Sequence, residues 1–336
     1  MLTVLDNVPD GLLDLTAEQL HTRLPGPTLL HLPGRIAEPV FISVLLHGNE
    51  TTGWNALRAV LRAYRGHDLP GSVSILIGNV AAARYGKRHL PDQPDYNRVW
   101  KDGGSAEARM MRQVIDEMAR RRVRLSLDIH NTTGRNPHYA CVNRLDAPFL
   151  GLAGLFSRIV VYFHQPDSVQ CMAFSRLCPS VTVECGQVGD VSGVDHARRF
   201  IESVFSLEGA APDRAADLDL FQTRVRVRVP VDQDFGFGPG HALSLDPDIE
   251  RLNFTELASP QHIATTTRPG GMPLEVLDDA GNDVAAAYLH RDGDAIHLLR
   301  GVVPAMITSN PEIVRQDCLC YLMERIPLPV AGEPAR

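Results

Sequence analysis

The stretch VFISVLLHGNE at residues 40–50 decides the fold of this chain. Its first seven residues, Val40 to Leu46, are almost all apolar, which predicts a strand buried on both faces of a sheet. The tetrapeptide HGNE then forms a turn, and a helix is expected from about Thr51, because apolar residues recur there at helical spacing: Trp54, Leu57, Val60, Leu61 and Tyr64. A buried strand that leads through a short turn into an amphipathic helix is typical of α/β proteins.

The alternation of strands and helices continues through about residue 205. Short β-rich runs predict four further strands, at residues 73–77, 125–129, 159–163 and 181–184. Apolar residues at helical spacing predict two more helices, one around residues 110–118 and one around residues 200–205. We therefore expect an α/β domain in which helices flank a mixed, largely parallel sheet.

The pattern changes at the segment EGAAPDRAADLD, residues 208–219, which has the composition of a linker. Beyond it, residues 223–229 alternate arginine with valine, as in a strand with one solvated face. Short β-like runs and turns follow, among them the glycine-rich segment FGFGPG at residues 235–240, which we interpret as a turn. The sequence predicts a boundary near residue 210, between an α/β domain of residues 1–210 and a smaller β-rich domain of residues 211–336.

Composition limits the classes of protein to consider. With 336 residues, 44% hydrophobic and 22% charged, the chain has ordinary globular composition, which excludes a disordered or collagen-like protein. The formal net charge of −7 gives no support to a nucleic-acid partner. The basic run Arg120 to Arg124 follows a helical pattern, so we interpret it as cations at a helix C-terminus, with an anion-binding surface as the alternative.

Three features predict a cytoplasmic protein without a membrane partner. The longest apolar run, residues 147–156, is shorter than the roughly 20 residues that span a bilayer. The N-terminal segment MLTVLDNVPDGLLDL carries acidic residues where a secretory signal needs positive ones. The six cysteines form no CxxC pair, so free thiols are expected.

The turn after the first predicted strand holds two side chains of the types that bind metals. His47 and Glu50 are three residues apart, close enough at a strand-to-helix turn to bind one ion. His130 follows the predicted strand at residues 125–129, and the carboxyl ends of parallel strands gather at one edge of a sheet. Two histidines and one carboxylate are a common ligand set of catalytic zinc. We therefore predict a zinc site formed by His47, Glu50 and His130.

Two further motifs meet the demands of such a site. The run VTVECG predicts a strand ending in Glu184, and a glutamate beside the metal can accept a proton from water and pass it to a leaving nitrogen. The alternative role for Glu184 is structural, in a helix cap or a salt bridge. The tetrapeptide DYNR at residues 95–98 joins Asn97 to Arg98, and an amide beside a guanidinium matches a substrate carboxylate.

In their order along the chain, these motifs resemble the succinylglutamate desuccinylase and aspartoacylase family, within the zinc carboxypeptidase superfamily. The resemblance is carried by HGNE at 47–50, GNV at 78–80, Arg88 with DYNR at 95–98, DIHNTTG at 128–134 and VECG at 183–186. It covers roughly residues 40–205. It implies a zinc carboxypeptidase-like α/β fold with one zinc ion per chain, followed by a smaller domain that narrows access to the site.

The resemblance also implies roles for single residues. It assigns zinc binding to the three predicted ligands and the general base to Glu184. Arg88 corresponds to the arginine that stabilises the oxyanion formed during hydrolysis, and Asn97 and Arg98 to the pair that holds the carboxylate of the amino acid. Asp128 lies two residues before His130, where it either orients that ligand or makes a buried hydrogen bond unrelated to the metal.

The chain departs from the family pattern at two places. The segment between Arg88 and Asn97 is longer than in the family and contains two prolines. No tyrosine matches those that contact the acyl group in aspartoacylase-like members, so Arg135 and Arg176 are only candidates for binding a second carboxylate, and Tyr288 and Tyr321 stay unaligned.

We expect a zinc-dependent hydrolase that cleaves the amide bond of an N-acyl amino acid or a related small amide. Its partner is then a small-molecule substrate, and a homo-oligomer is left open. One alternative is a zinc carboxypeptidase acting on short peptides, against which the β-rich tail argues. The other is a metal-free binding module on the same scaffold, against which the complete ligand set argues.

Overall fold

The computed structural model describes residues 1–207 and 217–329. The chain forms two compact units: the first contains Met1–Asn131, His138–Asp219 and Leu328–Arg336, and the second contains Thr132–Pro137 and Leu220–Pro327. The predicted boundary near residue 210, and most of the predicted linker, lie outside the described residues. That boundary therefore stays a prediction.

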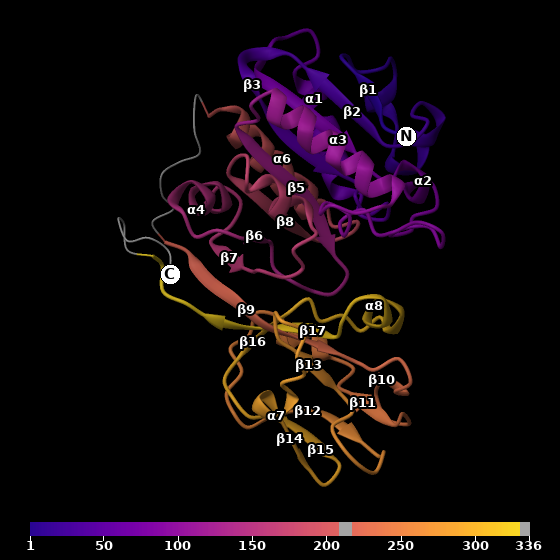
Figure 1. Cartoon of the computed structure of the whole chain (residues 1–336), viewed down its shortest axis with the longest axis vertical. Helices are drawn as coiled ribbons and strands as arrows, with labels where there is room; N and C mark the ends of the chain where they lie inside the picture. Colours follow the sequence, from indigo (N-terminus) through magenta and orange to yellow (C-terminus); the bar gives the residue numbers. More distant parts are fainter. Residues whose placement is uncertain (208–216, 330–336) are drawn as a thin grey trace. The chain divides into compact units, whose positions relative to one another are not determined.

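The first unit is built on a mixed sheet (Figure 1). Its strands lie in the order β1-β2-β4-β3-β5-β8-β6-β7. Their bounds are β1 Thr3–Leu5, β2 Thr28–Leu32, β3 Gly34–Val44, β4 Leu69–Ile77, β5 Leu125–Thr132, β6 Tyr139–Val142, β7 Ile159–Tyr162 and β8 Ser180–Gln187. The pairs β1–β2, β3–β4, β3–β5 and β6–β7 are parallel, whereas β2–β4 and β6–β8 are antiparallel. The predicted mixed, largely parallel sheet is confirmed.

The five predicted strands all form, but four of them end elsewhere than expected, β7 by a single residue. β3 ends at Val44, because Leu45 adopts a left-handed φ of 57° that begins the turn. β5 and β8 run beyond their apolar residues, to Thr132 and Gln187, so His130 and Glu184 lie inside strands rather than at their ends. An apolar sequence pattern ends at the first polar residue. The hydrogen-bonded strand can continue beyond it where the buried polar side chains are themselves hydrogen-bonded. The apolar pattern did not reveal β1, β2 and β6.

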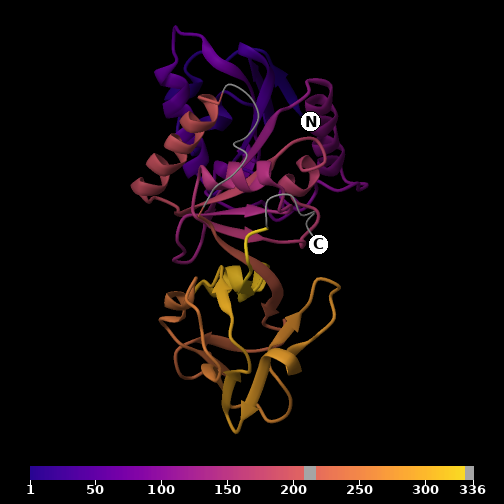
Figure 2. The ribbon, with the colours of Figure 1, turned by 90° about the vertical axis from the view of Figure 1, so that its left-hand side faces the viewer.

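Helices cover both faces of this sheet. Those of the first unit are α1 Thr52–Ala63, α2 Val80–Ala83, α3 Ala106–Arg120, α4 Ala147–Gly154, α5 Gln170–Phe174 and α6 Val191–Phe205, of which α1, α3 and α6 were predicted. α1 and α6 lie side by side over β3 and β8, while the buried methionines of α3 pack with Phe41 and Phe174 on the other face. Figure 2 shows α6 and α3 on opposite sides of the strands. No helix among the described residues is long and apolar enough to cross a membrane.

The predicted basic run lies at the C-terminal end of α3. Arg121 Nε is 2.6 Å from Glu117 Oε1, Arg120 also pairs with Glu117, and Arg122 Nη2 is 2.9 Å from Glu38 Oε1. These arginines line a cavity of about 490 Å³. Because each of the three is paired with a carboxylate, the contacts agree with cations placed at a helix C-terminus.

The second unit is rich in β-structure, as predicted. One group of strands contains β9 Asp219–Arg228, β13 Glu275–Leu277, β16 Val303–Ala305 and β17 Cys320–Arg325. A five-stranded sheet contains β10 Phe235–Phe237, β11 Leu243–Leu245, β12 Gln261–Thr266, β15 Ala295–Leu298 and β14 Leu289–Asp292. Two short helices, α7 Ala285–Tyr288 and α8 Pro311–Gln316, accompany them. The segment predicted as a turn at residues 235–240 begins with β10, because Phe235 packs into the core of this unit.

Candidate metal centre

The turn that follows β3 is folded tightly against a neighbouring loop. The amide of Glu50 donates to the carbonyl of His47 at 3.1 Å, and the amide of Gly48 donates to the carbonyl of Arg88 at 3.0 Å. A Cβ on Gly48 would lie 2.3 Å from the backbone nitrogen of Ala83. Only glycine fits there, so the close approach of two backbones fixes the positions of His47 and Glu50.

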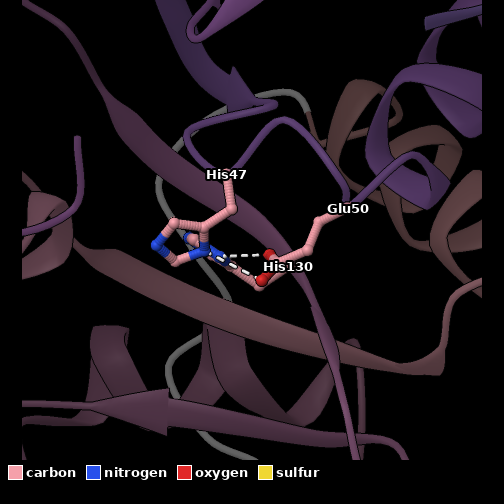
Figure 3. A group of neighbouring side chains, drawn as sticks. All are labelled: His47, Glu50 and His130. Atoms are coloured by element: carbon pink, nitrogen blue, oxygen red, sulfur yellow. Dashed lines mark hydrogen bonds and ion pairs between the residues drawn. The ribbon is translucent and has the colours of Figure 1, made fainter. Parts of the chain in front are cut away.

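His130 reaches this turn from the adjacent strand. β3 and β5 are parallel, with Val44 opposite Ile129, so the residue after Ile129 lies beside the turn that follows β3. Figure 3 shows both histidine rings facing the carboxylate of Glu50, with one dashed line to each of its oxygens. His47 Nδ1 is 2.8 Å from Glu50 Oε1, and His130 Nδ1 is 2.7 Å from Glu50 Oε2. All three side chains are buried, and one ligand atom from each lies within 4.8 Å of the others. The structure thus brings together the three predicted ligands.

Each histidine is held at its second nitrogen by an aspartate. His47 Nε2 lies 2.9 Å from Asp95 Oδ1, and His130 Nε2 lies 2.9 Å from Asp128 Oδ2. Both Nδ1 atoms are thereby directed at Glu50. A metal-binding histidine commonly donates its other N–H to a carboxylate, which fixes the tautomer and the ring. Of the two roles left open for Asp128, the contact favours orientation of His130. Sequence reasoning did not assign a role to Asp95, although it begins the DYNR motif.

The donor set fits a zinc ion. Two imidazole nitrogens and one carboxylate are available, and all belong to buried residues, with 3–6% of their surface exposed. Burial alone would raise the pKa of Glu50, but the two adjacent histidines hold it well below its usual range. Glu50 is therefore ionised, as a metal ligand must be.

Glu184 lies on β8 and has an unsatisfied oxygen. Its Oε2 is buried and has no hydrogen-bond partner among the described residues. Burial raises the pKa of Glu184 to about 7, although the charge of His130 opposes the shift. A buried carboxylate with an open oxygen and a pKa near neutrality can exchange a proton with a neighbouring group.

Arg88 lies next to the three candidate ligands. Its guanidinium binds Asp95 Oδ2 through Nε at 3.1 Å and Nη2 at 2.8 Å, and its Nη1 is 3.7 Å from Glu50 Oε1. The longer segment that precedes Asn97 therefore still places Arg88 beside the site, where its charge and that of Asp95 offset each other. Arg98 is partly exposed and donates from Nη1 to the carbonyl of Asn97 at 3.0 Å.

Asn97 is buried between the site and α5. Its Oδ1 accepts the backbone N–H of Gln170 at 2.9 Å, and its Nδ2 is 3.2 Å from His130 Nε2. By contrast, Arg176 is exposed just after α5. Arg135 belongs to the second unit, where its backbone N–H donates to Glu250.

Comparison with known protein families agrees with this fold. The family model described as "Succinylglutamate desuccinylase/Aspartoacylase catalytic domain" matches residues 37–209, just over half of the chain. The matched segment contains all seven residues predicted for the site. The chain belongs to the succinylglutamate desuccinylase/aspartoacylase family, whose members are hydrolytic deacylases.

Solved structures share the fold at low sequence identity. A succinylglutamate desuccinylase from Chromobacterium violaceum is 19% identical with a TM-score of 0.58, over 88% of this chain and 87% of that chain. Murine aminoacylase 3 is 16% identical with a TM-score of 0.56, over 87% and 95% of the two chains. The product-bound ectoine utilization protein EutE from Ruegeria pomeroyi is 16% identical with a TM-score of 0.56, over 88% of each chain. No curated protein sequence matches the chain.

Proposed function

We propose that this protein is a zinc-dependent amidohydrolase that removes the acyl group from an N-acyl amino acid or a related small amide, with one zinc ion per chain. The observation that carries the proposal is the buried group of His47, Glu50 and His130 beside Glu184, whose Oε2 has no partner among the described residues. Membership in a family of deacylases supports this reaction class over a carboxypeptidase.

The chain's own residues supply the proton transfer and the charge stabilisation. Zinc, when bound, supplies a Lewis acid that polarises the scissile carbonyl and acidifies water. Glu184 accepts at Oε2 a proton from the water that attacks the carbonyl carbon. It then delivers this proton to the leaving nitrogen as the C–N bond breaks, so that carboxylate and amine are released. Arg88 lies beside Glu50, where its guanidinium stabilises negative charge that develops on the carbonyl oxygen.

Arg98 is our candidate for binding the carboxylate of the amino acid. Its guanidinium is only partly buried, and the planar fork of a guanidinium matches a carboxylate. The family resemblance assigns the same task to Asn97. The solved relatives are named for different substrates, so the acyl group is not fixed by membership in the family. A cytoplasmic location and a partner set without nucleic acid stay predictions.

The experiment that tests the proposal pairs metal analysis with a substrate panel. Untagged protein is analysed for zinc, and amine release is measured with N-acetyl, N-succinyl and N-formyl amino acids and with a tripeptide. We expect about one zinc per chain and release from at least one acyl amino acid. Release from the tripeptide alone would indicate a carboxypeptidase. Protein without bound metal that holds an acyl amino acid without turnover would indicate a binding module.

A further inference from the structure

The side-chain amide of Asn97 connects three parts of the first unit. Asn97 is 6% exposed. Its Oδ1 accepts the backbone N–H of Gln170, the first residue of α5, and its Nδ2 lies 3.4 Å from Asp128 Oδ2 and 3.2 Å from His130 Nε2 on β5. The N–H groups of a first helical turn have no partner within the helix, so Asn97 also satisfies one of them on α5. Both ends of the amide are engaged by the protein.

When a metal is bound, the position of the His130 ring proton determines whether Asn97 Nδ2 can donate to His130 or to Asp128. His130 Nδ1 faces Glu50, so for this nitrogen to bind a metal the ring proton must be on Nε2, which then donates to Asp128 Oδ2. The Nδ2 of Asn97 is also a donor, and its remaining acceptor is Asp128.

Asp128 is a fully buried carboxylate, with 0% of its surface exposed. Besides its contacts with His130 and Asn97, its carboxylate accepts hydrogen bonds from Ser43 Oγ at 2.7 Å and from Thr182 Oγ1 at 3.4 Å. Burying a carboxylate costs free energy unless hydrogen-bond donors surround it. Those donors also fix the position of the Asp128 carboxylate, and thereby the direction of its hydrogen bond with His130.

We infer that Asn97 is a positioning residue of the metal centre: its amide holds Asp128, and through Asp128 the ring of His130, in the orientation that directs Nδ1 toward Glu50. The inference rests on the proposed metal-dependent function. It gives Asn97 a different role from the substrate contact implied by the family resemblance, and it leaves Arg98 to bind the substrate carboxylate.

The first test replaces Asn97 with alanine. Groups that orient a metal ligand typically contribute about 10- to 100-fold to metal affinity, so Asn97→Ala is expected to weaken Zn²⁺ binding by that factor, measured by competition with a chelating dye. The visible absorption spectrum of the Co²⁺-loaded variant is expected to change, because His130 is less well fixed. KM for the best panel substrate is expected to stay near the wild-type value. Arg98→Gln is the control, with raised KM and unchanged Zn²⁺ affinity.

A second pair of variants changes the same contact from the side of α5. Gln170 is the first helical residue and Val169 before it is extended, with φ −93° and ψ 162°, so proline is compatible with this position. Gln170→Pro removes the N–H that Asn97 accepts and puts ring carbon in its place. Gln170→Ala keeps that N–H and loses only the side chain, which bonds Ser126 Oγ at 2.7 Å. We expect Gln170→Pro to weaken Zn²⁺ binding relative to Gln170→Ala by about the factor seen in Asn97→Ala.

The outcomes separate this inference from the proposed function. Wild-type protein that binds no Zn²⁺ would remove both. Wild-type protein that binds Zn²⁺, with unchanged affinity and a raised KM in Asn97→Ala, would overturn the inference alone and return Asn97 to the substrate. Thermal unfolding in the presence of a chelator checks that each variant is folded. If Asn97→Ala does not fold, equal Zn²⁺ affinity of Gln170→Pro and Gln170→Ala overturns the inference.

Discussion

Glu50 and Glu184 are two buried glutamates of the same site with opposite electrostatic surroundings. Glu50 lies between two histidines, which hold its pKa below the usual range. Glu184 has an oxygen without a partner among the described residues, and burial raises its pKa to about 7. In the proposed mechanism, one carboxylate is thereby kept ionised for binding a cation, and the other exchanges a proton near neutral pH. Environment, rather than residue type, divides the two roles.

The first prediction at this scale concerns the proton acceptor. Glu184→Gln keeps the shape of the side chain but cannot accept a proton, so kcat should fall by about 10²- to 10⁴-fold while zinc content is unchanged. Steady-state kinetics and elemental analysis of the same preparation measure both. Glu202→Gln on α6, where the carboxylate pairs with Arg198, is the control and should retain activity. Wild-type turnover in Glu184→Gln would remove this residue from the mechanism.

The pH dependence of activity provides a second prediction. Glu184 must be ionised to act as a base, so kcat/KM should fall about tenfold for each pH unit below its pKa. That pKa is about 7 without metal, and a bound cation lowers it, so the acid limb should lie at or below about pH 7. The profile is measured on metal-saturated enzyme, with zinc content checked at each pH. An acid limb centred above pH 8 would contradict the assignment.

At the scale of elements, the site depends on how closely β3, its turn and α1 are packed. Gly48 lies against the backbone of residues 82–87. A Cβ on Gly53 in α1 would lie 3.0 Å from the side chain of Val44 and 3.1 Å from that of Ile129. The turn cannot move outward without losing its hydrogen bond to the Arg88 carbonyl. The candidate metal ligands are therefore held by backbone packing as well as by their own hydrogen bonds.

A substitution in the turn tests this packing. Gly48→Ala places a Cβ 2.3 Å from a backbone nitrogen, which cannot yield as a flexible side chain would. We expect the free energy of unfolding to fall by roughly 1–3 kcal/mol, together with weaker zinc binding. Denaturant unfolding measures the first effect and dye competition the second. Gly26→Ala, at a glycine with nothing within 4 Å of an added Cβ, should change stability by less than about 0.5 kcal/mol. Equal stability of the two variants would show that the turn has room to adjust.

At the scale of the whole molecule, the candidate ligands all belong to the first unit although the chain forms two. Residues 132–137 belong to the second unit and directly follow the strand segment that carries His130. The catalytic residues proposed above, Arg88 and Glu184, also lie in the first unit. Metal binding is therefore expected to stabilise the first unit directly.

Metal removal should accordingly lower thermal stability. An ion that binds only the folded state stabilises it by about 4 kcal/mol when its free concentration is about 1,000-fold above Kd. Calorimetry with and without a chelator should show a lower Tm for the metal-free protein, and zinc should restore it. His47→Ala should show no response to zinc, because two ligands rarely hold the ion. A zinc-dependent rise in the Tm of His47→Ala would show that the ion binds elsewhere.

Much of the candidate site could be predicted because its signals are local. The apolar run before His47 predicts a strand, the spacing of His47 and Glu50 predicts that they bind one ion, and the parallel sheet predicts that His130 joins them. Tertiary contacts of the loops could not be predicted in this way. Asp95 contacts His47, which lies 48 residues away in the sequence, and Asn97 contacts Asp128, which lies 31 residues away. The path of the loop between α2 and α3 is set by packing against β5 and α5, not by any period in its own sequence.

Periodicity along the chain predicted five strands and three helices of the first unit, and motif spacing predicted the residues of the candidate metal site and the family. Folding in three dimensions sets the contacts of Asp95 and Asp128 with the two histidines, pairs Arg88 with Asp95 and turns the amide of Asn97 inward. These contacts depend on distances and directions between side chains from different elements. Such distances exist only once the hydrophobic core has fixed the elements in place.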